Sequence, residues 1–262
     1  MKNLFEKAGK NFIKQIDYMG GVAGLVVFSI IERLFGERRG NKVVNQILIK
    51  QIFFTGWEAL FIITIIAILL GLVITIQTTS QLTKFGAENL IGKILIITLV
   101  RELGPILTAI IIVGRSGTAI ATEIGNMTVA HEIEALESMG IDTLKYIMFP
   151  RLIGVTIATI GLTVYFAAFG ILGGIILTSL QLSIPLSKFF NILFSNLKLL
   201  DILILILKSA IFGAIIATIP VYHGFKIRMS STEVPQAATK SVVRTLIYIF
   251  IFNSIITAIF YI

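Results

Sequence analysis

Residues 94–113 read ILIITLVRELGPILTAIIIV, a run of twenty residues whose only charged side chains are the neighbours Arg101 and Glu102. An α-helix of about 20 apolar residues is long enough to cross the hydrocarbon core of a bilayer. A charge near the middle of such a helix is costly unless it faces a protein interior or a wet cavity. The run therefore predicts a membrane-spanning helix that carries a functional site inside the membrane.

The rest of the chain has the composition of a membrane protein. Of its 262 residues, 56% are hydrophobic and only 14% are charged, whereas a soluble domain carries about 25% charged residues. Four further stretches lack Asp, Glu, Lys and Arg: 59–76, 152–180, 209–222 and 245–262. We therefore expect an all-α integral membrane protein with five transmembrane helices.

Details of these stretches suggest how the helices end. At helical rise, residues 152–180 would reach about 43 Å, more than the roughly 30 Å hydrocarbon core, so this helix must tilt, project or break near Gly173 and Gly174. Lys208 separates residues 202–207 from the fourth stretch. It is expected to extend toward the headgroups from the outer end of that span.

The N-terminal region differs from the spans. Residues 18–31 are uncharged but number only 14, a length that favours a helix lying on the membrane surface. We therefore expect residues 1–50 to form a cytoplasmic or interfacial amphipathic segment and residues 51–262 to form the transmembrane domain.

The distribution of Lys and Arg predicts the orientation. With the N-terminus in the cytoplasm, fifteen basic residues lie on that side and four on the other, while Arg101, Arg115 and Lys208 lie within spans. Because short cytoplasmic loops carry the excess of Lys and Arg, this bias places the C-terminus outside. Anionic lipid headgroups account for the net charge of +8, so no nucleic-acid partner is expected.

Residues 128–139, between the second and third spans, predict a short amphipathic cytoplasmic helix. Four apolar residues fall on one stripe and three glutamates mostly on other faces: Val129, Ile133, Leu136 and Met139, against Glu132, Glu134 and Glu137. Surface-seeking helices are usually rich in Lys and Arg. The acidity of this one favours docking of a protein partner over an interfacial helix, although spacing alone permits both.

The ends of this helix also carry signals. Asn126 or Thr128 could cap its start, Gly140 can take the left-handed conformation after its end, and Asp142 can cap the helix that follows. These signals predict a well-defined turn into the third span.

The order of motifs resembles one family over most of the chain. The motif residues are RELGP at 101–105, GRSGTAIATEIG at 114–125, then Met127, Glu132, Ala135, Leu136, Met139, Gly140, Asp142, Pro150 and Arg151, with Gly224, Ala237, Thr239, Val242 and Val243 near the end. This order is similar to that of the MlaE/YrbE permeases, membrane subunits of ABC transporters that maintain lipid asymmetry. One departure is that Met229 and Ser230 stand where many relatives have small glycines.

The resemblance implies a complex in a bacterial inner membrane. Its expected parts are a homodimer of this subunit, two cytoplasmic ABC ATPase subunits and a periplasmic lipid-binding protein of the MCE type. The complex would move phospholipid or a similar amphiphile between the inner membrane and an outer compartment. Residues 86–93 only approximate a Walker A motif, and Ile94 stands where Ser or Thr would bind Mg²⁺. We therefore expect ATP and Mg²⁺ on the partner ATPase, no cofactor in this chain and no enzymatic activity of its own.

The substrate site is predicted around the charged pair. Neighbours on a helix point about 100° apart, so Arg101 and Glu102 each need a further partner. Pro105 lacks the amide that would bond the carbonyl of Arg101. A stripe from Arg101 through Pro105 to Arg115 is expected to line a cavity at the dimer axis, which Gln77 could also face. The alternative is that Arg101 pairs with a carboxylate on another helix and serves assembly alone.

Two other functions are weighed. Residues 114–117 match the Gly-x-Ser-Gly pattern of intramembrane serine proteases, but neither histidine lies in a predicted span to serve as the base. An ion-coupled carrier working through Glu102 would favour inverted repeats, which five spans do not provide. No motif for a metal site is present in the sequence. Transport that persists without a co-expressed ATPase would support the ion-coupled carrier.

Overall fold

The computed structural model describes residues 17–32, 41–86, 90–181, 186–227 and 230–261. These ranges are almost entirely helical and contain no strand. Five of the helical segments are long and apolar enough to cross a membrane: Lys42–Leu82, Leu90–Val129, Leu144–Ile176, Leu199–Phe225 and Glu233–Phe260. The prediction of an all-α protein with five membrane-spanning helices is confirmed.

Three of the spans are built from several consecutive helical pieces. The first joins α2 (Asn41–Gly56), the 3₁₀ turn η1 (Trp57–Ala59) and α3 (Leu60–Leu82). The second joins α4 (Leu90–Leu95), η3 (Ile96–Leu103), α5 (Gly104–Ile112), η4 (Val113–Gly117) and α6 (Thr118–Val129). The third joins η5 (Leu144–Met148) and α8 (Phe149–Gln181), while α10 (Leu199–Phe225) and α11 (Glu233–Tyr261) form the fourth and fifth. η3, η4 and η5 are π-helical, a conformation frequent at functional sites.

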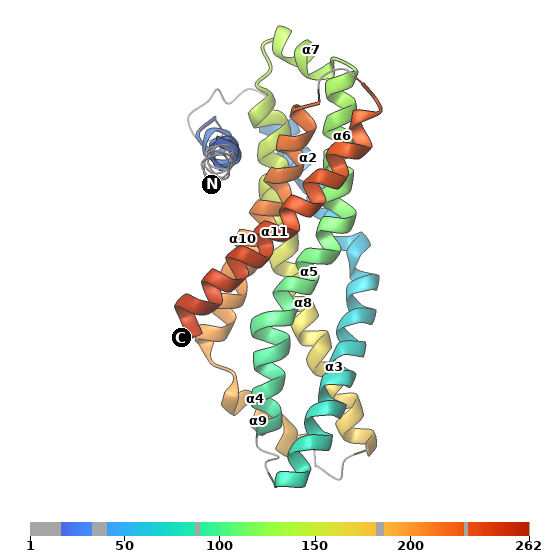
Figure 1. Cartoon of the computed structure of the whole chain (residues 1–262), viewed down its shortest axis with the longest axis vertical. Helices are drawn as coiled ribbons and strands as arrows, with labels where there is room; N and C mark the ends of the chain where they lie inside the picture. The colour runs from blue at the N-terminus through green and yellow to red at the C-terminus, as the bar shows by residue number, and fades with distance from the viewer. Residues whose placement is uncertain (1–16, 33–40, 87–89, 182–185, 228–229, 262) are drawn as a thin grey trace, which may run out of the picture.

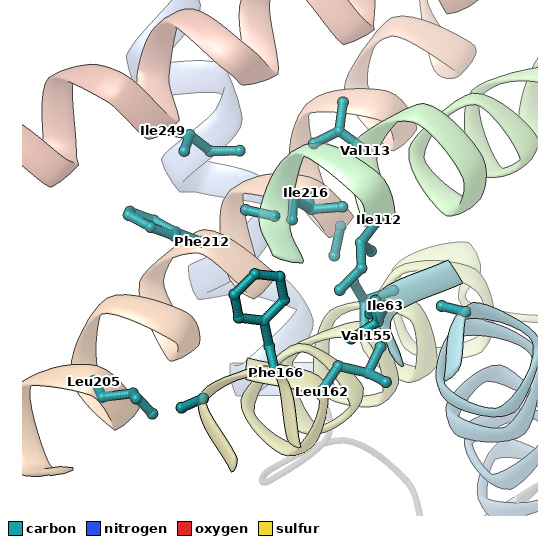
Figure 2. Close-up of a cluster of buried hydrophobic side chains, with 14 of the residues drawn as sticks. Ile63, Ile112, Val113, Val155, Leu162, Phe166, Leu205, Phe212, Ile216 and Ile249 are labelled. Atoms are coloured by element: carbon teal, nitrogen blue, oxygen red, sulfur yellow. The ribbon is translucent and has the colours of Figure 1, made fainter. Parts of the chain in front are cut away.

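The spans form an elongated bundle with α8 in contact with α2, α3, α5 and α10 (Figure 1). Phe166 of α8 is fully buried, and Figure 2 shows its ring among side chains of three other spans, including Phe212 and Ile216 of α10 and Ile112 of α5. This cluster of large apolar side chains is the core of the bundle.

Small residues allow α8 to approach α3 closely. A Cβ added at Gly71 of α3 would overlap the carbonyl oxygen of Gly170, and one added at Gly173 would overlap the carbonyl of Ile68. α8 is continuous through Gly173 and Gly174. The helix therefore does not break there, and these glycines serve close helix packing.

Three shorter helices lie outside the spans. α7 (Glu132–Ser138) crosses one end of the bundle, and α9 (Leu186–Asn196), which the sequence did not predict, lies near α4 at the other end (Figure 1). Residues 17–32 form a helix that runs crosswise to the spans. The boundary expected between residues 50 and 51 lies inside α2.

The N-terminal helix is held against α10 and α11 by an aromatic cluster. The Tyr18 ring packs edge-on against Tyr222 at 4.9 Å between centroids and stacks on Tyr248 at 6.1 Å. The Arg244 guanidinium lies 4.2 Å from the centroid of the Tyr18 ring. This helix is thus tied to the last two spans by cation–π and ring contacts.

Candidate functional site

Arg101, in η3 of the second span, pairs with the start of the fourth span. Its Nε lies 2.8 Å from Oδ1 of Asp201, a residue in the first turn of α10 that is only 1% exposed. The other oxygen of this carboxylate accepts a hydrogen bond of 3.1 Å from the backbone N–H of Lys198. Asp201 therefore caps α10 and neutralises Arg101 at once, which is the inter-helix pairing considered as the alternative from the sequence.

Glu102 points to a different neighbour and joins the fourth and fifth spans. Its Oε1 accepts hydrogen bonds of 3.0 Å from Lys208 Nζ and from the Thr257 hydroxyl. Its Oε2 accepts one of 3.0 Å from Asn253 Nδ2. Consecutive positions on one helix therefore reach separate partners, because their side chains point in different directions.

Lys208 corrects an expectation from the sequence. It does not extend to the headgroups, because its side chain is completely buried. Its Nζ donates to Glu102, to Thr257 Oγ1 at 2.8 Å and to the Arg101 carbonyl at 2.9 Å. Three acceptors match the three N–H donors of an ammonium group, so this buried charge is fully satisfied.

The Arg101 carbonyl can accept the hydrogen bond from Lys208 because of Pro105. Proline has no N–H to donate to the carbonyl four residues earlier, and in this helix the ammonium of Lys208 fills that position at 2.9 Å. Pro105 itself is buried at the start of α5. A break in the backbone hydrogen bonds of one span thus creates the acceptor that anchors a second span.

Arg115 does not lie on the same side of the second span as Arg101, although the predicted stripe places both there. Its Nη1 donates to the Phe54 carbonyl at 3.0 Å, its Nη2 pairs with Glu58, and its guanidinium lies 4.9 Å from the centroid of the Phe54 ring. Arg101 therefore contacts α10, whereas Arg115 contacts α2 and η1. The wide turns of η3 and η4 change the register between the two residues.

The other positions of the predicted cavity lie apart. Thr108 and Ile112, which lie between Pro105 and Arg115 on the predicted stripe, are fully buried inside the bundle. Gln77 is exposed near the end of α3 that lies away from α7 (Figure 1). Within this chain these residues do not share a single surface with Arg101, and their common cavity stays a prediction for the expected homodimer.

The acidic helix is shorter than the predicted 128–139. Thr128 belongs to the end of α6, where its hydroxyl bonds the Ile124 carbonyl at 2.8 Å, so it does not cap α7. His131 precedes α7 with a φ of 57°. Two predictions at the other end are confirmed: Gly140 has a φ of 73°, and Oδ1 of Asp142 accepts the backbone N–H of Leu144 at 2.8 Å.

α7 has one apolar face and one acidic face. Ile133 and Leu136 are half-buried against the core, while Glu132 and Glu134 are exposed. Glu137 accepts a hydrogen bond of 3.0 Å from the Thr143 hydroxyl. Met139, expected on the apolar stripe, is 67% exposed just after the helix. The surface facing away from the bundle thus combines carboxylates with an apolar side chain.

Sequence reasoning missed the partners of the charged pair. Asp201 is the only acidic residue between Asp142 and Glu233, and Asn253 and Thr257 are four residues apart within an apolar stretch. Both patterns single out polar side chains that belong inside a bundle. They do not reveal which span each side chain meets.

Comparison with known proteins identifies the family. The sequence model described as Permease MlaE matches residues 48–259. The chain belongs to the MlaE permease family. A probable ABC transporter permease of Synechocystis sp. is 33% identical over 229 residues, covering 87% of each chain. A probable ABC transporter permease of Rickettsia bellii is 32% identical over 216 residues, covering 82% of this chain and 83% of the relative.

A third MlaE relative bears a more specific name. The intermembrane phospholipid transport system permease protein MlaE of Haemophilus influenzae is 29% identical over 232 residues, covering 87% of this chain and 89% of that one. The charge network and α7 both lie within the residues that the family model matches.

Proposed function

We propose that this MlaE-family chain is the membrane subunit of an ABC transporter that moves phospholipid, or a similar hydrophobic amphiphile, between the inner membrane and an outer compartment. The observation that carries the proposal is the match of residues 48–259 to the permease family. The name of the Haemophilus relative supports phospholipid as the substrate class. Energy comes from a separate ATPase that holds ATP and Mg²⁺.

The proposed assembly is a homodimer with two cytoplasmic ATPase subunits and a periplasmic MCE-type lipid-binding protein. In the proposed orientation the N-terminus and α7 lie in the cytoplasm and the C-terminus in the periplasm, and the excess of basic residues on the proposed cytoplasmic side supports it. Residues 17–32 lie crosswise to the spans, as a helix on the membrane surface would. Arg101 remains 19% exposed beside Asp201, which leaves it able to meet an anionic headgroup in a dimer cavity.

α7 is the proposed coupling helix. Its acidic face, with Glu132, Glu134 and Glu137, would receive the ATPase, and Gly140 would set the turn behind it. Ile133 and Leu136 pack on the core, so movement of α7 would be transmitted to the ends of the second and third spans as a rigid-body shift.

Reconstitution with the ATPase tests the function. Purified complex should carry a co-purified lipid class, identifiable by mass spectrometry, and should transfer that lipid between vesicles only when ATP is hydrolysed. Lipid transfer that continues without the ATPase would instead support the ion-coupled carrier.

A matched pair of variants tests the docking surface. Glu132→Lys with Glu134→Lys should abolish co-purification of the ATPase, because both exposed carboxylates face away from the bundle. Asp17→Lys with Glu233→Lys, at exposed positions outside α7, changes the net charge equally and should leave co-purification unchanged. Equal ATPase binding by the two variants would refute the role of α7.

A further inference from the structure

A second polar site lies in a crevice between α2, α6 and α8. The crevice has a volume of about 330 Å³. Its walls combine apolar residues with three charged side chains: Ile47, Phe54, Ile120, Lys50, Glu123 and Arg151.

Arg151 is the buried cation of this crevice. The residue is only 7% exposed, and its Nη2 lies 2.8 Å from Oε1 of Glu123. Its Nη1 donates to the Ile147 carbonyl at 3.3 Å. Its Nε is buried and has no hydrogen-bond partner in the part of the chain that the structure describes. Because an unmade hydrogen bond of a buried charged group is costly, this N–H marks a place for an acceptor.

The charges around the crevice favour an anion. Lys50 is exposed at its rim, and the carboxylate of Glu123 is already paired with Arg151. Two cations therefore face one carboxylate. Guanidinium and ammonium groups together are suited to phosphate, which accepts several charge-assisted hydrogen bonds.

The depth of the crevice matches that of lipid headgroups. Lys50 lies eight residues after the start of the first span, Arg151 seven after the start of the third, and Glu123 six before the end of the second. These offsets correspond to about 9–12 Å along each helix. Helices of 33 to 41 residues reach about 50–60 Å, more than the roughly 40–45 Å of a whole bilayer, so headgroups should lie some turns inside the helix ends.

Exposed apolar side chains on the span that carries Lys50 could contact acyl chains. Ile49 and Trp57 are 65% and 64% exposed on the first span. The rings of Phe53 and Trp57 are stacked, with 6.0 Å between centroids. Exposed tryptophan is enriched at membrane–water interfaces, so this part of the first span is suited to the interface.

We propose that this crevice binds the phosphate of an anionic lipid headgroup in the leaflet on the α7 side of the membrane. The site is separate from the network of Arg101 and Glu102. It does not depend on transport, because it requires only that the spans cross a bilayer.

Native mass spectrometry of the purified full chain, titrated with dioleoyl phosphatidylglycerol, tests the proposal. Lys50→Gln should weaken binding about tenfold, since one hydrogen bond to a charged group is lost. Arg151→Lys keeps the charge facing Glu123 but removes the Nε donor, and should weaken binding by a similar factor. Lys42→Gln, on the same helix but outside the crevice, should bind as the unmodified chain does. Thermal unfolding of each variant verifies folding, and Lys50→Gln, at an exposed position, keeps the test valid if Arg151→Lys fails to fold.

Two outcomes would overturn the proposal. Lys50→Gln and the unmodified chain could bind the lipid equally, in which case the crevice is no headgroup site. Inorganic phosphate alone could bind as tightly as the lipid and show the same loss in Lys50→Gln, in which case the site belongs to free phosphate.

Discussion

Glu102 and the glutamates of α7 show how one side-chain type can serve two purposes. Both oxygens of Glu102 accept hydrogen bonds, from Lys208, Thr257 and Asn253. Glu132 and Glu134 are exposed at the end of the bundle. A carboxylate in the middle of the spans is thus committed to holding helices together, whereas those on α7 remain accessible to another protein. Substitutions should therefore affect stability at the first region and assembly at the second.

The largest loss of stability is expected for Lys208→Met. Removing the ammonium leaves Glu102, whose side chain is 28% exposed, without its cation, which costs about 3–4 kcal/mol. The midpoint of thermal unfolding in detergent measures the loss. Glu102→Gln combined with Lys208→Met should recover much of it, because no unpaired charge remains. If Lys208→Met alone is as stable as the unmodified chain, the network is not required for folding.

A smaller loss of stability is expected when the ion pair between Arg101 and Asp201 is broken. Asp201→Asn keeps an oxygen that can cap α10 but removes the charge facing Arg101, and should cost about 2 kcal/mol because Arg101 is partly exposed. Asp201→Ala removes the cap as well and should cost about 1 kcal/mol more. Equal unfolding midpoints for the two variants would argue against the capping role.

Pro105→Ala tests whether the hydrogen bond from Lys208 depends on the free backbone carbonyl of Arg101. The alanine restores an N–H that can compete with Lys208 for the Arg101 carbonyl, an effect of about 1 kcal/mol. Lys208→Met should therefore cost less in the Pro105→Ala background than alone. A double-mutant cycle on unfolding midpoints measures this coupling, and strictly additive effects would contradict it.

A third region, the contact of the N-terminal helix with the last two spans, depends on pH through Tyr18. Burial raises the pKa of Tyr18 from 10.0 to about 12, although Arg244 acts to lower it. Because the folded pKa is raised, the contribution of Tyr18 to docking is complete below pH 10 and is lost as the pH rises toward 12. The chain has no cysteine, so Val22→Cys can report docking by its reactivity with a thiol reagent, compared with exposed Val27→Cys.

The reactivity of Val22→Cys relative to Val27→Cys should rise between pH 10 and 12. Adding Tyr18→Phe should flatten that rise, because phenylalanine does not titrate. An unchanged rise in the Tyr18→Phe background would assign the effect to other groups.

The smallest effect on stability is expected on α7. Glu132→Lys with Glu134→Lys should change the free energy of unfolding by about 1 kcal/mol or less, since both side chains are exposed and lose only contacts with the start of α7 and with His131. Circular dichroism and thermal unfolding verify this. A large destabilisation would show that the acidic face serves the fold, and would weaken the comparison with Glu102.

Much of the fold follows from local sequence. Apolar length predicts the five spans, Gly140 and Asp142 predict the turn after α7, and the motif order indicates the family. α9 and the end of α6 at Val129 were not predicted, because short apolar segments do not reveal where a helix stops. Lys208 was misplaced because its position along the chain gives its depth in a span but not the direction of its side chain.

The sequence by itself determined that charged residues lie among apolar spans and that Arg101 and Glu102 cannot neutralise each other, because both results depend only on helix geometry and the cost of burying charge. The tertiary structure alone decided their partners. Asp201, Lys208 and Asn253 lie 100 or more residues further along the chain, and such distant contacts depend on how helices pack. The carbonyl freed by Pro105 likewise found its donor only when α10 packed beside the second span.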